Sequence, residues 1–321
     1  MNVLYSHSKP AGSKKLKKEI AGSLKLLYML FPRKTNPRAS FESRWKSFHN
    51  ILTVNGVFMN AINAITIERA REEDAAVLAT VCKEAFHTDV DVGAPGSGEP
   101  GGPPDYDSPD FQKFIMSVLT YYKILIGDKI VGGVFFDHGN AEHYILERIF
   151  VSPAYHNRGI ATQAMELVHK NHPEAKIWTL GTPKWNIRTR HFYEKLGYVQ
   201  VGWEEEESPD WWGIWYQKNV KPYTFPKISD LKDGMRAISV EGKIASILPA
   251  REVESEKGRE KTIVAGAKLV DDSGKIILEL RGHHVQVVRE NKAVRIENGQ
   301  VSTQEGELLL KVPYGRIITL L

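Results

Sequence analysis

The stretch RIFVSPAYHNRGIATQAMELV, residues 148–168, decides the fold, because an apolar strand pattern passes here through a basic polar turn into a helical pattern. A strand that ends at Val151 and a helix that begins near Arg158 leave the first N–H groups of that helix without carbonyl partners. These groups and the helix dipole attract an anion such as a phosphate. Gly159 lets the main chain approach a pyrophosphate, and Ala161 keeps the helix start uncrowded. A glycine here is also typical of a purely structural turn, so both interpretations stay open.

Strand and helix patterns alternate on both sides of this stretch. Ser108 and Pro109 form an N-cap and a first helical position, and Gly127-Asp128 joins two strands as a hairpin. The expected strands cover residues 65–70, 122–128, 129–139, 143–151, 175–182 and two runs within 199–219, and the expected helices cover residues 71–86, 108–122, 159–172 and 187–198. This alternation predicts an α/β domain with a mixed central sheet and helices on both faces.

Length and charge divide the chain further. Its 321 residues favour two domains, and formal charge separates a basic leader (+9 over residues 1–58), an acidic middle (−7 over 59–221) and a nearly neutral end (+2 over 222–321). We therefore expect a basic extension over 1–58, an α/β domain over 59–220 and a second domain over 221–321. The single cysteine, Cys82, excludes an internal disulfide and a cysteine-based zinc cluster and favours a cytoplasmic location.

The leader is expected to be poorly ordered or to lie outside the mature protein, because regular periodicity begins only after Met59. Its apolar patch is interrupted by Lys25 and is far shorter than the roughly 20 residues of a membrane span. No membrane partner is expected, although a basic amphipathic helix over 14–30 that touches anionic surfaces remains an alternative.

Two blocks, LERIFVSPAYHNRGIATQAM and WNIRTRHFYEKLGY, resemble the GNAT superfamily of acyl-CoA-dependent N-acetyltransferases over roughly residues 65–218. The family's pyrophosphate loop has Gln or Arg, two residues, Gly, one residue, then Gly or Ala; here His156 stands in the Gln/Arg place. The resemblance implies a GNAT fold, acetyl-CoA as cosubstrate without a metal, and transfer of an acetyl group to an amine of unknown identity. The positions that it assigns to the cofactor are Ile149, Val151, His156, Arg158, Gly159, Ile160, Ala161, Thr162 and Asn186.

The resemblance also implies a catalytic arrangement. The strand that bears ERIFV separates from IWTLG, so that main-chain groups around Ile149 and Val151 pair with the pantetheine arm. Tyr193 occupies the family's tyrosine position, where a phenol protonates the leaving sulfur, and the alternative is an aromatic residue of the core. Glu147 is the candidate base, and the alternative is a solvated strand carboxylate. Asn186 hydrogen-bonds near the cofactor arm, caps the following helix, or does both.

The acceptor side is less specific. The acidic hairpin GWEEEESPDWWG, residues 202–213, carries Glu204 to Glu207 and three tryptophans, which would suit a cationic amine by charge and cation–π contact. A solvated acidic turn whose tryptophans pack on a strand pair is an equally good interpretation.

After residue 221 the chain has short β-rich runs between Gly, Asp, Asn and Pro turns, which predicts a small all-β barrel. This part resembles the OB-fold of archaeal single-stranded DNA-binding and replication protein A families over nearly all of residues 228–318. Tyr314 is its only Phe, Trp or Tyr ring after Lys227, so base stacking should be weak, and paired His283 and His284 should be exposed. The candidate phosphate contacts are Arg251, Arg259, Lys261, Arg281 and Arg289.

Two functional classes follow. One is an acetyltransferase whose accessory OB domain recruits a nucleic acid or a protein partner, and the other is a binding module that keeps a CoA-binding fold without catalysis. The occurrence together of Gly159, Ala161, Asn186 and Tyr193 favours the enzyme.

Overall fold

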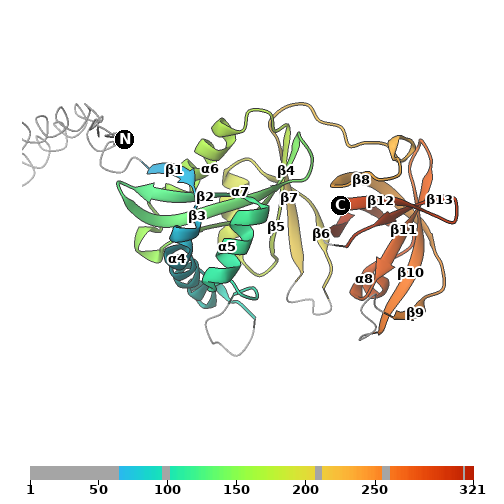
Figure 1. The fold of residues 1–321 in the computed structure, drawn as a ribbon, viewed down its shortest axis with the longest axis horizontal. Coiled ribbons are helices and arrows are strands. Elements are labelled where there is room, and N and C mark those ends of the chain that lie inside the picture. The colour runs from blue at the N-terminus through green and yellow to red at the C-terminus, as the bar shows by residue number, and fades with distance from the viewer. Residues whose placement is uncertain (1–64, 96–101, 207–211, 255–260, 314) are drawn as a thin grey trace, which may run out of the picture. The chain divides into compact units, whose positions relative to one another are not determined.

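The computed structural model describes residues 65–95, 102–206, 212–254, 261–313 and 315–321 (Figure 1). The chain divides into two compact units, Met1–Asn63 and Ala64–Leu321, and the first lies outside the described residues. The expectation of a poorly ordered leader over 1–58 falls there too. The expected boundaries at residues 59 and 221 stay predictions.

Strands and helices alternate up to Asn219, and strands dominate after it. In chain order the elements are β1 (Ile65–Arg69), α4 (Ala75–His87), η2 (Thr88–Val92), α5 (Pro109–Val118), β2 (Thr120–Ile126), β3 (Lys129–His138), β4 (His143–Val151), η3 (Pro153–Tyr155), α6 (Ile160–Asn171), β5 (Ile177–Pro183), α7 (Ile187–Lys195), β6 (Val199–Glu204), β7 (Gly213–Asn219), β8 (Ile238–Ile247), β9 (Arg251–Glu254), β10 (Lys261–Val270), β11 (Lys275–Arg281), α8 (His283–Val287), β12 (Ala293–Gln304), β13 (Glu307–Lys311) and β14 (Arg316–Leu320).

The first seven strands form a mixed sheet in the order β1-β2-β3-β4-β5-β7-β6. Neighbours are antiparallel except β4 and β5, which run parallel and are connected through α6. Apolar residues of α4 and α5 pack on one face of the sheet, and those of α6 and α7 pack on the other (Figure 1). The expected mixed sheet with helices on both faces is confirmed.

Local signals place several element ends. The Ser108 hydroxyl accepts the Phe111 N–H at 3.3 Å and caps α5, which begins at Pro109. The expected helix over 108–122 was too long, since α5 ends at Val118 and Thr120 already pairs with β3. The sheet prevails there because Tyr121 is buried in it and donates its hydroxyl to Gln112 at 2.6 Å.

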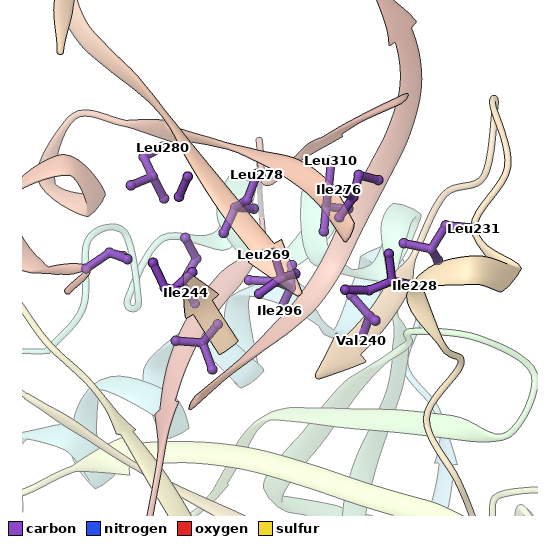
Figure 2. Packing of buried hydrophobic residues seen from close by; sticks show 14 of the residues in the cluster. Ile228, Leu231, Val240, Ile244, Leu269, Ile276, Leu278, Leu280, Ile296 and Leu310 are labelled. Atoms are coloured by element: carbon purple, nitrogen blue, oxygen red, sulfur yellow. The ribbon is translucent and has the colours of Figure 1, made fainter. Parts of the chain in front are cut away.

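The C-terminal strands pair in a cycle. β8 pairs with β10 and β12, β10 with β11, β11 with β13 in parallel, and β13 with β12. A single apolar cluster lies inside, with Val240, Ile244, Leu269, Leu278 and Ile296 almost fully buried (Figure 2). The described residues of the C-terminal part thus form strands and one short α-helix, α8, whereas the identity of this part as an OB barrel stays a prediction.

The last strand joins the two groups of strands. β14 pairs with β12 on one side and, through Thr319↔Trp203 and Leu320↔Gly202, with β6 on the other. A side chain at Gly202 would place its Cβ 2.1 Å from the Thr319 carbonyl oxygen, so this approach requires glycine. Ile318 of β14 packs on Trp215, and the sheet order continues from β6 into β14.

A buried polar cluster reinforces this contact. Thr179 of β5 donates its hydroxyl to Glu297 of β12 at 3.2 Å and meets the His143 Nε2 at 2.8 Å. Arg295 donates to Gln217 of β7 at 2.8 Å and to Glu241 of β8. Burial lowers the pKa of His143 to about 3, so this ring is neutral, and burial raises the pKa of Glu297 to about 7.

The raised pKa of Glu297 makes stability depend on pH. Because the carboxyl is harder to ionise in the folded state, its contribution to stability is complete below its unfolded pKa and is lost as pH rises to about 7. We expect Glu297→Gln to leave the Tm nearly unchanged at pH 5. At pH 8.5 the substitution should raise the Tm by a few degrees, which corresponds to roughly 1–3 kcal/mol in the free energy of unfolding. Thermal unfolding at both pH values measures this, with exposed Glu252→Gln as control. A lower Tm for Glu297→Gln at pH 8.5 would show that the ionised carboxylate stabilises the fold.

Candidate active site

The site begins where β4 and β5 part. Their parallel pairing covers His143↔Ile177, Tyr144↔Trp178 and Ile145↔Thr179, and no pair follows, although β4 continues to Val151 and β5 to Pro183. The main-chain groups of β4 that face β5 beyond this point have no strand partner there. A strand edge of this kind can pair with an extended ligand.

A β-bulge lies in β4 beside the parting point. The register with β3 runs through Phe135↔Arg148 and then Phe136↔Leu146, so Glu147 is the extra residue. Bulges redirect side chains. Arg148 lies over the rings of Phe86 and Phe111, on the face of α4 and α5, and Glu147 turns toward β14.

The turn after β4 prepares the start of α6. Asn157 and Gly159 have φ of 59° and 73°, and Gly159 is the N-cap residue. The first intrahelical bond joins the Gln163 N–H to the Gly159 carbonyl at 3.0 Å, which leaves the N–H groups of the first turn for another acceptor. A Cβ built on Gly159 meets only the Gln163 amide, at 3.8 Å, so space remains in front of the turn.

The side chains of this turn make contacts within the protein. His156 does not face the helix start; its Nε2 lies 2.8 Å from the Val151 carbonyl oxygen and ties the turn to the end of β4. Arg158 lies over the Tyr155 ring at 5.4 Å, with Lys129 over the same ring at 5.3 Å. Two cations therefore stand beside the turn, although no ligand contact of either is established. Ile160 is buried, whereas Ala161 and Thr162 are partly exposed.

Asn186 caps α7. Its Oδ1 accepts the Thr189 N–H at 3.1 Å, and its Nδ2 donates to Asp89 of η2 at 3.2 Å. Arg188 donates to the same Asp89 oxygen at 2.6 Å. The capping interpretation is thus observed, and these bonds hold η2 against the start of α7.

Tyr193 of α7 is buried with Ile149 in one apolar cluster, and its ring lies edge-on to Tyr198 at 5.9 Å. Burial raises the pKa of the phenol far above its usual value, so the hydroxyl stays protonated at neutral pH. The core position and the position near β4 are both observed, and neither by itself establishes a catalytic role.

Glu147, the candidate base, is paired with an arginine of the C-terminal part. Arg316 of β14 donates Nη1 and Nη2 to the two Glu147 oxygens at 3.3 and 3.2 Å. Two parallel hydrogen bonds from a guanidinium fix the orientation of a carboxylate and occupy both of its oxygens. No local sequence pattern predicts this pair, since the two residues are 169 positions apart.

A second carboxylate shares the same arginine. The Glu204 Oε2 lies 3.7 Å from the Arg316 Nε and accepts the Trp215 indole N–H at 3.3 Å. Burial raises the pKa of Glu204 to about 7. Asp137 of β3 also has a raised pKa, because of burial and the nearby Glu147 charge. Both interpretations of the hairpin, a cation-binding surface and a solvated acidic turn, placed Glu204 in a group of four glutamates and not beside a partly buried arginine.

Other described residues of that turn form hydrogen bonds within the turn. The Trp203 indole donates to Glu205 at 3.1 Å, and the Trp212 indole donates to the Glu206 carbonyl at 3.2 Å. Glu207 and Trp211 lie outside the described residues.

Two of the basic candidates of the C-terminal part lie level on neighbouring strands, because Arg251 of β9 and Arg281 of β11 are both register partners of Val264 on β10. Arg251 is exposed on β9, Lys261 pairs with Glu252 at 3.3 Å, Arg281 pairs with Glu279 at 2.6 Å, and Arg289 donates to the carbonyls of Gln286 and Val288. Arg259 and Tyr314 lie outside the described residues. His284 is buried in the short helix α8 beside His283, at 4.2 Å between ring centroids, so the expected exposed pair was wrong for His284.

No helix among the described residues is long and apolar enough to cross a membrane. Within the same ranges, no three His, Cys, Asp or Glu side chains are grouped so that they could hold a metal ion.

Residues 95–198 match the family model described as Acetyltransferase (GNAT) family. The uncharacterised protein YrkN of Bacillus subtilis (strain 168) is 30% identical over 144 residues, which are 44% of this chain and 77% of YrkN. The single-stranded DNA binding protein Ssb of Saccharolobus solfataricus is 26% identical over 84 residues, 26% of this chain and 55% of Ssb. The chain thus spans about half the length of Ssb.

Solved structures of N-acetyltransferases are similar at low identity. The PaiA N-acetyltransferase of Thermoplasma acidophilum, in complex with coenzyme A, gives a TM-score of 0.41 with 16% identity, over 49% of this chain and 99% of that one. The ribosomal-protein-S18-alanine N-acetyltransferase of Escherichia coli gives 0.39 with 14% identity, over 50% and 96%.

Proposed function

Because residues 95–198 make this chain a member of the GNAT acetyltransferase family, we propose that it transfers an acetyl group from acetyl-CoA to an amine. One observation carries the proposal: the unpaired edge of β4 leads directly into a turn that presents the first N–H groups of α6. An extended arm with a pyrophosphate at one end requires such an edge followed by such a helix start.

The cosubstrate fits the residues of this turn. The first-turn N–H groups of α6 bind the pyrophosphate, and the open space at Gly159 allows the close approach. Ile149 and Val151 offer main-chain groups to the arm, although the Val151 carbonyl already meets His156. His156 therefore acts by bracing the turn, and Arg158 and Lys129 supply positive charge beside it.

Acetyl transfer needs two proton movements. The acceptor ammonium gives one proton to a carboxylate, and the neutral nitrogen forms the C–N bond as the C–S bond breaks. The second nitrogen proton ends on the sulfur. The raised pKa of Tyr193 makes complete proton transfer from its phenol unfavourable, so its contribution is a hydrogen bond donated to the leaving sulfur.

Charge favours a cationic acceptor. Asp137, Glu147, Glu204 and Glu297 gather around Arg316, and they outnumber the cations there, Arg316 and Arg295. An excess of carboxylates attracts an ammonium and disfavours an anionic substrate.

A secondary role is proposed for the C-terminal strands: weak binding of single-stranded nucleic acid through phosphate contacts. The similarity to Ssb favours it. Partly paired surface cations, with no aromatic platform among the described residues of β8 to β14, favour salt-dependent binding with little base preference.

The first test concerns cosubstrate binding. Gly159→Glu puts bulk and negative charge in front of the helix start and forces a side chain into φ of 73°. We expect calorimetry to show an acetyl-CoA affinity at least about tenfold lower in a folded variant. Lys195→Gln, an exposed change at the far end of α7, is the control. Unchanged affinity in Gly159→Glu would place the cosubstrate elsewhere.

The second test concerns Tyr193. Tyr193→Phe removes only the hydroxyl, so we expect acetyl-CoA affinity to be kept and kcat to fall by about 10- to 100-fold. Turnover is measured as CoA thiol release with a mixture of small amines. Wild-type kcat in the variant would remove Tyr193 from the mechanism. A wild-type protein that binds acetyl-CoA but acetylates no amine would favour the non-catalytic binding module.

The third test concerns nucleic acid. Fluorescence anisotropy of the full chain with labelled single strands should show weak binding that falls steeply between 50 and 200 mM salt, by roughly tenfold or more. Arg251→Gln with Lys261→Gln should reduce the salt slope by about 2. Nanomolar binding that is insensitive to salt would instead require a stacking surface.

A further inference from the structure

Arg316 reaches the proposed acetyltransferase site from β14, the strand that continues the sheet order after β6 and belongs to the C-terminal strands. β14 holds it in register opposite Glu297 of β12, and pairing of the same strand with β6 fixes β14 beside Trp203. The guanidinium lies 5.3 Å from the centre of the Trp215 ring, and the Gly181 position of β5 leaves room for that ring. The arginine is thus positioned by elements on both sides.

This arginine treats the two nearby carboxylates differently. Glu147 receives two parallel hydrogen bonds, one to each oxygen, which occupy both oxygens and fix the orientation of the carboxylate. Glu204 lies 3.7 Å from the Nε of Arg316 through its Oε2, and the same oxygen accepts the hydrogen bond from the Trp215 indole. Glu204 is also the more buried of the two, with its side chain 16% exposed against 24% for Glu147.

We propose that Arg316 is a positioning residue of the transfer site: it keeps Glu147 as a paired carboxylate and leaves Glu204 as the group that accepts the proton of the acceptor ammonium. The inference rests on the proposed acetyltransferase function and deepens it. The C-terminal strands are then part of the catalytic arrangement.

The proton balance is simple. The ammonium N–H bond breaks, its electron pair stays on nitrogen, and the proton moves to a Glu204 oxygen, directly or through one water. Glu204 returns this proton to solvent after the C–N bond has formed. Glu147 and Arg316 keep their charges throughout and orient the site.

The groups that face Glu204 set its pKa, and this pKa sets the acid limb of the pH–rate profile. Burial is the largest effect and raises the pKa of Glu204, and Glu206 of the turn and Glu147 of β4 raise it further. Arg316 of β14 and the Trp215 indole of β7 lower it. Asp137 of β3 and Glu297 of β12 interact electrostatically with the same two groups, the Arg316 guanidinium and the Glu147 carboxylate. The balance gives a pKa of about 7, which suits a base at neutral pH.

The experiment compares pH–rate profiles of kcat/KM for the full chain, with CoA release from acetyl-CoA and the best amine of a mixed panel. We expect a wild-type acid limb near pH 7. Glu204→Gln should abolish that limb and lower kcat by about 100-fold or more. Glu147→Gln should keep the limb and move it to lower pH, because a negative charge beside Glu204 is removed.

Arg316 variants test the positioning role. Arg316→Gln should move the acid limb to higher pH, because a positive charge beside both carboxylates is lost, and should lower kcat more than it raises KM. Arg316→Lys keeps the positive charge, so the pH of its acid limb should lie close to that of the wild type. Exposed Arg236→Gln, in the same part of the chain, is the matched control.

Acetyl-CoA affinity and Tm show that each variant is folded. A double-mutant cycle of Arg316→Gln and Glu147→Gln on the Tm adds a readout of the pair that needs no turnover, and additive effects would contradict the pairing. Loss of the limb in Glu147→Gln with retention in Glu204→Gln would overturn the assignment, as would an unmoved limb in Arg316→Gln. Absence of any wild-type turnover would refute the proposed function itself.

Discussion

The arrangement of the site depends on one constraint, the end of β4–β5 pairing at Ile145↔Thr179. Up to that pair the two strands satisfy each other's main-chain groups, and beyond it each needs another partner. On β4 the unpaired edge runs toward the start of α6. On the other side of β5, Gly181 is the register partner of Trp215 on β7, whose ring supports Arg316. The break in the β4–β5 ladder therefore creates the open edge of β4, and the pairing of β5 with β7 provides the place for the charged groups.

The charged groups are costly to bury, and the fold offsets this cost by pairing them across elements. Arg316 binds Glu147 and approaches Glu204, and Arg295 binds Gln217 and Glu241. The contacts of Arg316 with Glu147 and Glu204 and of Arg295 with Gln217 link the C-terminal strands to the first seven strands, whereas Arg295 and Glu241 pair within the C-terminal strands. A buried carboxylate that lacks a full partner is the exception, and Glu204 and Glu297, both with pKa values near 7, are of this kind. Such groups are unfavourable for stability at high pH and are suited to moving protons.

Much of the acetyltransferase sheet could be predicted from local patterns. Ser108 caps α5, Gly127 turns the β2–β3 hairpin at φ of 60°, and Asn186 caps α7, because each of these roles depends on a residue and its near neighbours. The end of α5 was missed because Tyr121 gains more from burial in the sheet than its helical neighbours indicate.

The sequence by itself determined the strand–turn–helix unit at residues 148–168, since the turn at Gly159 and the exposed first turn of α6 follow from backbone chemistry over a few residues. Only the tertiary structure decided the charges around it. Glu147 and Arg316 stand 169 residues apart, and Thr179 and Glu297 stand 118 apart. Their meeting depends on the pairing of β14 with β6, which requires the absent side chain of Gly202. A carboxylate's role as base or as ion-pair partner is set by burial and by neighbours in space, and no pattern along the chain contains those.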